Sequence, residues 1–322
     1  MPFAVLFPGQ GSQFVGMGAD LFDARADLLV DTAEGVLGWS LRDLCLGGPE
    51  DELTRTERAQ PALFALAYAL WEELEERISG LPSGAAGHSV GEYTAHAAAG
   101  TFTYADGLRL VAARGEGMAA AADRQPSGMA ALLGVQAEEV QRVVAARASE
   151  GGRLWIANLN APGQVVVAGG ARDLQWLTDR GREHGIRRVV PLKVAGAFHS
   201  PLMEPAVGPL RTALSAVSFS EPRFAVWGNS SAAPVGKDQV PEELARQIVS
   251  PVRFADSLAA MASSGVDVFV HVGPGDVTAG MARRTVPDAE VLVVNDLASA
   301  AAAAERLGPL RTMPGRASEG SA

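Results

Sequence analysis

Short apolar runs that end at proline or glycine turns give this chain its framework. The run at 3–7 predicts a buried strand closed by Pro8, and the run at 266–272 predicts another, closed by a Gly-Pro-Gly turn. A further strand is expected at 290–294. Stretches of helical composition lie between and after these strands, at 20–45, 61–78, 104–123 and 299–304. Alternating strands and helices are typical of an α/β fold.

The stretch 61–78 changes character along its length. It is almost wholly apolar up to Trp71 and turns acidic from Glu72 onward. We therefore expect its first part to be buried. Pro61 stands at its start, which suits the first turn of a helix.

The segment 126–195 has its own pattern of alternating apolar and polar runs. Its apolar and polar runs predict strand, helix, strand, strand, helix and strand, at 129–135, 136–148, 154–158, 164–169, 174–183 and 187–192, with a turn at 160–163. This β-α-β-β-α-β order is that of a ferredoxin-like unit. We interpret 126–195 as a small domain inserted into a large domain made of 1–125 and 196–309. Residues 310–322 are expected to form a loose tail.

Composition and charge narrow the function classes. The 322 residues are 48% hydrophobic, and 27 basic against 37 acidic residues give a formal charge of −10. An acidic chain without a basic block is not suited to binding nucleic acid. No apolar run reaches the roughly 18 residues that span a bilayer, and the start lacks the basic region of a signal peptide. Cys45, the single cysteine, is expected to be a buried thiol in a cytoplasmic protein.

The strongest candidate for chemistry is the Gly-x-Ser-x-Gly pattern at 87–91, which centres on Ser89. A run of small residues precedes it and a helical stretch follows, which is the strand-turn-helix context of a nucleophile elbow. Glycines on both sides let the backbone bend sharply and leave the hydroxyl accessible. The alternative is a glycine-rich turn whose serine only caps a helix.

The loop 8–13, Pro-Gly-Gln-Gly-Ser-Gln, resembles a phosphate loop only superficially. It lacks the Gly-Lys-Ser/Thr ending, and position 14 is Phe where a dinucleotide fingerprint has its third glycine. We interpret it as a rigid loop that presents backbone N–H groups. No cofactor and no metal are expected.

Arg114 is a cation on an otherwise apolar helix face. Spacings of three and four residues place it with Leu110, Val111 and Met118. A buried guanidinium is costly unless an anion meets it. From spacing alone, an internal salt bridge and an anionic substrate are equally good explanations.

A serine nucleophile needs a base, and two of the five histidines are suitably placed. His199 follows a strand at a domain junction, where active sites commonly form, whereas His271 lies inside an apolar strand. We favour His199 as the base and interpret His271 as structural. No acidic residue is placed to orient the base, but a backbone carbonyl could fix its tautomer equally well.

Eight ordered motifs resemble a known family. The chain is similar, over about residues 3–295, to malonyl-CoA:acyl carrier protein transacylases and to discrete acyltransferases of polyketide synthases. The motifs are FPGQGSQ at 7–13, QPAL at 60–63, GHSVGE at 87–92, Arg114-Gly115 with Met118, NAPGQ at 160–164, AFHS at 197–200, SPVR at 250–253 and GPG at 273–275.

The resemblance implies a fold and a set of roles. The fold would be a large α/β-hydrolase-like domain with a parallel sheet plus the inserted ferredoxin-like domain. Ser89 would accept the acyl group, with His199 as base and Arg114 as partner of the malonyl carboxylate. The remaining implied roles are oxyanion-hole N–H groups from Gln10 and Val90, orientation of the histidine by the backbone carbonyl of Gln247, and substrate contacts from Asn160, Phe198 and Met118.

Two positions depart from the family pattern. Position 271 is His where Glu is common, and position 276 is Asp where a basic residue is common. Both are expected near the site, where they could tune binding of the partner. Phe198 resembles the malonyl-selecting version, which disfavours an α-methyl branch.

The resemblance implies malonyl-CoA and a phosphopantetheinylated acyl carrier protein as partners, and we expect a monomer. An acidic carrier requires a basic patch on this acidic chain, for which the candidates are Arg187, Arg188, Lys193, Arg283 and Arg284. Three alternatives stay open: a polyketide-synthase acyltransferase using another acyl unit, a hydrolase with the same Ser–His pair, and a non-catalytic scaffold that binds the carrier.

Overall fold

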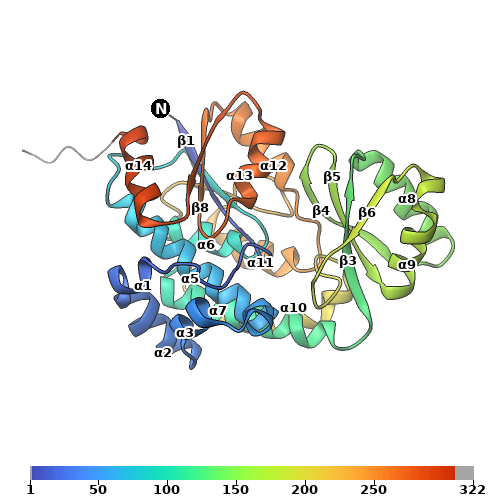
Figure 1. The fold of residues 1–322 in the computed structure, drawn as a ribbon, viewed down its shortest axis with the longest axis horizontal. Coiled ribbons are helices and arrows are strands. Elements are labelled where there is room, and N and C mark those ends of the chain that lie inside the picture. Colours follow the sequence, from blue (N-terminus) through green and yellow to red (C-terminus); the bar gives the residue numbers. More distant parts are fainter. Residues whose placement is uncertain (1, 309–322) are drawn as a thin grey trace, which may run out of the picture.

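The computed structural model describes residues 2–308, so the predicted tail at 310–322 lies outside it. Two sheets organise the chain (Figure 1). The first has five parallel strands in the order β7-β2-β1-β8-β9. Along the sheet these strands are Ala225–Trp227, Gly84–Gly87, Phe3–Phe7, Val268–Val272 and Glu290–Val294. Segments far apart in the sequence therefore meet on either side of β1.

The central strands are buried on both faces. Every residue of β1 and β8 is buried, which is why they appear in the sequence as continuous apolar runs. Odd-numbered residues of β1 pack in one apolar cluster with α5 (Thr56–Glu75), and even-numbered residues pack in another with α12 (Phe254–Ser263) and α13 (Val277–Thr285). The predicted strands at 3–7 and 290–294 coincide with β1 and β9.

Two helix predictions differ from the structure. The stretch 20–45 is not continuous, because Gly38 adopts a left-handed conformation with φ of 73° and Ser40 then caps a new helix. Helix α5 begins five residues before Pro61, so the proline lies inside the helix rather than in its first turn. The other helices around the first sheet are α1 (Leu21–Ala24), α2 (Ala33–Leu37), α3 (Leu41–Gly47), α4 (Glu50–Thr54), α6 (Gly91–Ala98), α7 (Tyr104–Ala122), α10 (Glu204–Ser215), α11 (Val240–Gln247) and α14 (Leu297–Leu307).

The second sheet is antiparallel, with strand order β4-β5-β3-β6. Its elements follow the predicted β-α-β-β-α-β order, as β3 (Ser127–Leu133), α8 (Ala137–Ser149), β4 (Leu154–Ala161), β5 (Gln164–Gly170), α9 (Ala171–Arg180) and β6 (Arg188–Pro191). One difference is that β4 runs through Asn160, so the expected turn at 160–163 is shorter. Ala130 and Leu132 of β3 pack in a separate core with residues of α8.

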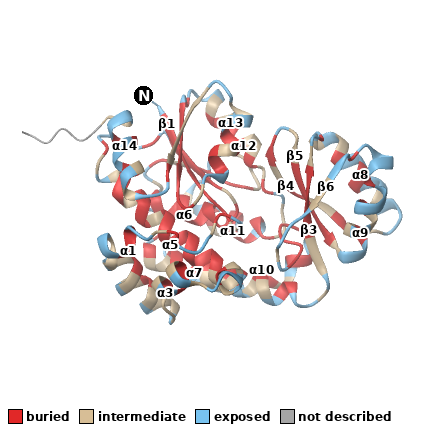
Figure 2. Cartoon of the chain, in the orientation of Figure 1, coloured by how far each residue is buried: buried red, intermediate tan, exposed pale blue. Residues whose placement is uncertain are grey.

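The second sheet bonds, at one edge of β4, to the segment between α11 and α12. The Val252 N–H donates to the Ala157 carbonyl at 2.8 Å, and the Leu159 N–H donates to the Val252 carbonyl at 2.8 Å. Figure 2 shows buried residues in the first sheet and in the strands of the second, and Ala157 and Val252 at this junction are themselves buried. Within residues 2–308, no helix combines the length and the apolar character needed to cross a bilayer.

Candidate active site

The turn at Ser89 joins β2 to α6 with almost no room for side chains. A Cβ on Gly87 would lie 1.8 Å from the Gly91 carbonyl carbon, and a Cβ on Gly91 would lie 2.4 Å from the Phe7 carbonyl oxygen. Only glycine therefore fits at either position. Ser89 itself has φ of 53°, a left-handed conformation that is uncommon for a residue with a side chain. The sequence context of a nucleophile elbow thus corresponds to a real strand-turn-helix junction.

Two amide side chains hold this turn in place. Asn229 accepts a hydrogen bond from the Ser89 N–H at 2.8 Å and donates to the Gly87 carbonyl at 2.6 Å. Gln247 donates from Nε2 to the Ser89 carbonyl at 2.9 Å. Both backbone groups of Ser89 are therefore paired, which stabilises the left-handed conformation.

His199 lies beside the serine hydroxyl. Its Nε2 is 2.8 Å from Ser89 Oγ, and its Nδ1 is 2.9 Å from the Gln247 carbonyl oxygen. Because a carbonyl can only accept, Nδ1 carries the proton and Nε2 faces the hydroxyl as an acceptor. Burial, helped by the charge of Arg114, lowers the pKa of His199 to about 3, so the ring is neutral at pH 7.

Arg114 is buried against the serine with only neutral partners. Its guanidinium donates to Ser89 Oγ at 3.0 Å, to Gln247 Oε1 at 2.8 Å and to Gln60 Oε1 at 2.7 Å. It also lies over the Tyr93 ring, 5.5 Å from the centroid. No Asp or Glu within residues 2–308 forms an ion pair with it, so the internal salt bridge that the sequence left open is not formed.

Ser89 and His199 line a cavity of about 200 Å³ between the two sheets, and Arg114 lies behind Ser89 without lining it. Ser89, His199 and Gln10 line it from the first sheet and its loops, whereas Met129 and Ala131 of β3 line it from the second. Since neighbouring residues of β3 face α8 instead, the cavity and α8 lie on opposite faces of the second sheet.

The other predicted substrate contacts also reach this cavity. Phe198, Asn160 and Met118 all line it. The Asn160 Oδ1 is 2.8 Å from His88 Nε2, and the Met118 sulfur accepts from Gln60 Nε2 at 3.6 Å. His88, which the sequence argument set aside as a base, is therefore part of the cavity wall.

The two backbone N–H groups suggested for an oxyanion hole come from different segments of the chain. Gln10 is in the loop after β1, and Val90 follows Ser89 directly. Neither N–H donates to another protein atom within residues 2–308, although the Gln10 side chain donates to Thr56 Oγ1 at 3.3 Å. Both donors are therefore available to a ligand.

The remaining positions singled out in the sequence lie elsewhere. His271 is buried in β8, with Nδ1 2.5 Å from Thr278 Oγ1 and Nε2 3.1 Å from the Gly273 carbonyl oxygen. It does not line the cavity, and neither does Asp276. Cys45 is buried, and burial raises its thiol pKa to about 12. Within residues 2–308, no cluster of His, Cys, Asp and Glu is placed to hold a metal ion.

Sequence reasoning gave no site role to two polar residues that complete this arrangement. Gln60 stands in the apolar first half of α5, and a lone amide in a buried helix is a signal that could have identified it. Asn229 follows the three-residue strand β7, which the apolar pattern did not predict. No local pattern distinguishes Asn229 from a loop residue.

Comparison with known proteins places this geometry in a family. A family model described as an acyl transferase domain matches residues 5–309. The malonyl CoA-acyl carrier protein transacylase of Bacillus subtilis (strain 168) is 39% identical over 297 residues, which are 91% of this chain and 93% of that protein. The enzyme of the same name from Escherichia coli (strain K12) is 35% identical, over 94% of this chain and 99% of the relative.

Longer proteins and solved structures match as well. The polyketide biosynthesis protein ThaF of Burkholderia thailandensis is 39% identical over 284 residues, or 24% of that protein. An acyl-carrier-protein S-malonyltransferase from Bartonella henselae superposes with a TM-score of 0.90 at 35% identity, covering 95% of this chain and 99% of that one.

A malonyl-transacylase solved in complex with its type II polyketide-synthase acyl carrier protein gives the same TM-score of 0.90 and the same 35% identity. That match covers 95% of this chain and 100% of the other. The chain therefore belongs to the acyl transferase family and, within it, to the malonyl-CoA:acyl carrier protein transacylases.

Proposed function

We propose that this chain transfers a malonyl group from malonyl-CoA to the phosphopantetheine thiol of an acyl carrier protein, for fatty acid or polyketide synthesis. Relatives named malonyl CoA-acyl carrier protein transacylase match nearly the whole chain. The observation that carries the proposal is the guanidinium of Arg114, which lies 3.0 Å from the Ser89 hydroxyl without an acidic partner in the described part of the chain.

Arg114 selects the acyl group by charge. A guanidinium binds a carboxylate with two parallel hydrogen bonds, and the bond is strong where water is excluded. A neutral alkyl chain would leave this buried cation unpaired, which costs free energy. The site therefore favours an acyl group that ends in a carboxylate over a simple fatty acyl chain.

The first half of the reaction acylates Ser89. His199 Nε2 takes the hydroxyl proton while Ser89 Oγ attacks the thioester carbon, and a tetrahedral intermediate forms. The carbon–sulfur bond then breaks, and the leaving thiolate of CoA receives the proton from His199. The Gln247 carbonyl stabilises the imidazolium that forms between these steps, because it accepts from Nδ1 at 2.9 Å.

The N–H groups of Gln10 and Val90 stabilise the negative oxygen of the intermediate. Removing one such donor typically costs about 3 kcal/mol of transition-state stabilisation. The positive end of α6 points at the same place, since Val90 directly precedes that helix.

The second half returns the malonyl group to a thiol. His199 takes the proton of the phosphopantetheine thiol, the sulfur attacks the malonyl-serine ester, and Ser89 is released with its proton restored. The two thiols use the same cavity in turn, so the kinetics are ping-pong. Phe198 lines this cavity, and we propose that it leaves no room for an α-methyl branch on the acyl group.

The carrier is proposed to dock beside the cavity through the basic patch, defined as Arg187, Arg188, Lys193, Arg283 and Arg284. All five side chains are exposed, and none forms an ion pair within residues 2–308. Leu192 and Val194, on either side of Lys193, line the cavity. Lys193 would therefore present positive charge to an acidic carrier close to the point where its arm must enter.

Steady-state assays with holo acyl carrier protein and with water as competing acceptors test this function. We expect the consumption of malonyl-CoA to depend on the carrier. We also expect malonyl-carrier to accumulate. Hydrolysis that proceeds equally fast without carrier would favour a thioesterase instead. The match to ThaF favours a second candidate, polyketide supply, and comparing carriers from the two pathways separates the two.

We also infer that residues 126–195 form the inserted ferredoxin-like domain and that 1–125 with 196–309 form an α/β-hydrolase-like domain. The antiparallel strand order and the separate apolar core of α8 support this division. The monomeric state, the cytoplasmic location and the independence from cofactors stay predictions.

A further inference from the structure

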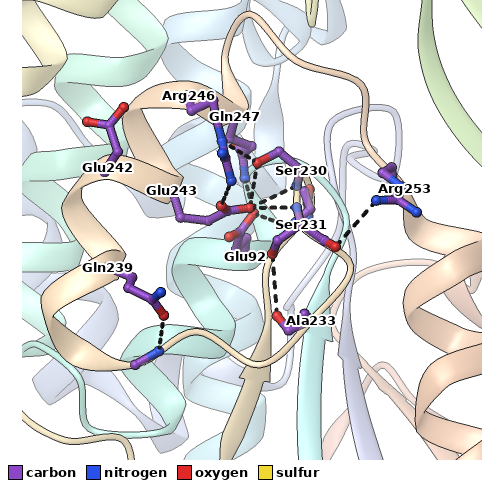
Figure 3. Close-up of polar contacts among 12 residues, drawn as sticks. Glu92, Ser230, Ser231, Ala233, Gln239, Glu242, Glu243, Arg246, Gln247 and Arg253 are labelled. Atoms are coloured by element: carbon purple, nitrogen blue, oxygen red, sulfur yellow. Dashed lines mark hydrogen bonds and ion pairs between the residues drawn. The ribbon is translucent and has the colours of Figure 1, made fainter.

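A buried carboxyl group, Glu92, lies directly behind the nucleophile. It stands in the first turn of α6 and is fully buried. Its Oε2 accepts from Gln247 Nε2 at 2.5 Å (Figure 3). The same oxygen accepts from the Asn229 N–H at 3.1 Å. One oxygen of Glu92 is thus bonded to both residues whose side chains clamp the backbone of Ser89.

The amide of Gln247 has only one orientation that satisfies its neighbours. Arg114 can only donate, so the amide oxygen must face it, as it does at 2.8 Å. The Ser89 carbonyl and Glu92 both accept, so the NH₂ group must face them. Glu92 supplies the second acceptor, which makes the opposite orientation costly.

This orientation determines where the guanidinium of Arg114 lies. Its three hydrogen-bonding partners are Ser89, which is the reacting group, and the side chains of Gln60 and Gln247. Of the two amides, only Gln247 is bonded to Glu92. If the Gln247 amide turned over, two sets of donors would face each other and the guanidinium would move away. A movement of about 1 Å at such a site is enough to reduce catalysis by roughly a hundredfold.

A second buried glutamate, Glu243, lies nearby but has different partners (Figure 3). It accepts from the Ser230 N–H at 2.9 Å and from the Ser231 N–H at 3.0 Å, and it pairs with Arg246. It is not bonded to Gln247 or to the Ser89 turn. Glu243 therefore provides a matched control for the loss of a buried carboxyl group.

Glu92 is a neutral acid at neutral pH. Burial, and then the charge of Glu243, raise the pKa of Glu92 to about 8, although Gln247, Asn229 and Arg114 oppose the shift. Its other oxygen, Oε1, has no partner within residues 2–308. A glutamine at this position has nearly the same shape and keeps one acceptor oxygen, so it can replace the neutral acid.

We propose that Glu92 is a positioning residue, which fixes the amide of Gln247 and thereby holds Arg114 where it binds the carboxylate of the acyl group. This inference rests on the proposed function. This positioning role predicts one effect that a purely structural role of Glu92 does not. Loss of the Glu92 acceptor should weaken recognition of malonyl groups more than it weakens acylation in general, because acetyl transfer does not need the guanidinium.

The test compares Glu92→Met, which removes the acceptor at similar volume, with Glu92→Gln and with Glu243→Gln. The readout is the ratio of kcat/KM for acylation by malonyl-CoA to that by acetyl-CoA. This ratio does not depend on how much of each preparation is folded. Thermal unfolding of all variants is followed in parallel.

We expect the ratio to fall about tenfold or more in Glu92→Met and to stay within about threefold of wild type in Glu92→Gln and Glu243→Gln. A wild-type ratio in Glu92→Met would overturn the proposal, and so would an equal fall in Glu92→Gln. Failure of the proposed function is distinguishable, since the wild-type protein would then either form no malonyl-enzyme or lose its malonyl group to water as fast as to the carrier, whatever ratio the variants show.

Discussion

A cation buried without an acidic partner is the most informative single residue. The sequence placed Arg114 on an apolar face but could not decide between a salt bridge and a substrate anion, because spacing says nothing about what lies opposite. The structure pairs it with two amide oxygens and the serine hydroxyl. Neutral acceptors hold the guanidinium in place and leave its charge for a ligand.

Replacing Arg114 should change the choice of substrate. In Arg114→Ala we expect kcat/KM for malonyl-CoA to fall about a hundredfold, because a charge-assisted hydrogen bond contributes about 1.5–3 kcal/mol. Acetyl-CoA should lose far less, so the preference between the two thioesters shifts toward acetyl. Arg109→Ala removes an exposed arginine from the same helix and serves as control. An unchanged preference in Arg114→Ala would refute the carboxylate assignment.

The pH dependence of acylation should reflect the burial of His199. Its folded-state pKa of about 3 lies below the ordinary value of 6.5, so the ring stays a base well into acid. We expect kcat/KM for acylation, measured by rapid quench, to persist below pH 6.5. The unfolded chain takes up this proton near pH 6.5, so His199 destabilises the fold as pH falls further. A loss of half the rate near pH 6.5 would contradict this assignment.

At the scale of elements, the elbow depends on close contact between α6 and β1. The apolar runs at 3–7 and 290–294 were enough to predict β1 and β9. β1 is buried on both faces and therefore has a continuous apolar signature, whereas β9 is an edge strand that is only partly buried. The prediction of one helix over 20–45 was wrong, because the non-helical Arg25 and the left-handed Gly38 interrupt a stretch whose composition is otherwise helical.

Adding one methyl group at the elbow should disturb it. In Gly91→Ala the new Cβ would lie 2.4 Å from the Phe7 carbonyl oxygen and 2.7 Å from that of Pro8, and backbone atoms cannot swing aside. We expect a loss of roughly 1–3 kcal/mol of stability, seen as a lower Tm, together with slower acylation. Gly35→Ala, in α2, meets nothing within 4 Å and should neither lower the Tm nor slow acylation. Equal Tm values for the two variants would disprove the steric argument.

At the scale of the whole molecule, the site exists only where the two sheets meet. The sequence carries Ser89, His199 and Arg114 on separate segments. The position of His199 at a domain junction favoured it as the base of Ser89, and the resemblance added Arg114 as the partner of the carboxylate. Asn229 and Glu92 received no role, because their importance comes from hydrogen bonds to residues more than a hundred positions away. Such partners leave no periodic signal in a single sequence.

The basic patch should control binding of the carrier and not of malonyl-CoA. We expect Lys193→Glu with Arg284→Glu to raise KM for acyl carrier protein about tenfold, or about 1.4 kcal/mol, with little change in KM for malonyl-CoA. The control, Arg142→Glu with Arg172→Glu, makes the same change of charge on α8 and α9, on the face of the second sheet away from the cavity. If both double variants raise the KM for acyl carrier protein equally, the effect comes from net charge and not from docking.

The most direct measurement is intact-protein mass spectrometry after exposure to malonyl-CoA and then to holo acyl carrier protein. We expect one malonyl adduct on the wild-type chain, no adduct on Ser89→Ala, and transfer of the adduct to the carrier on mixing. A malonyl adduct on Ser89→Ala at the wild-type level would contradict this expectation, as would an adduct that water removes as fast as the carrier does.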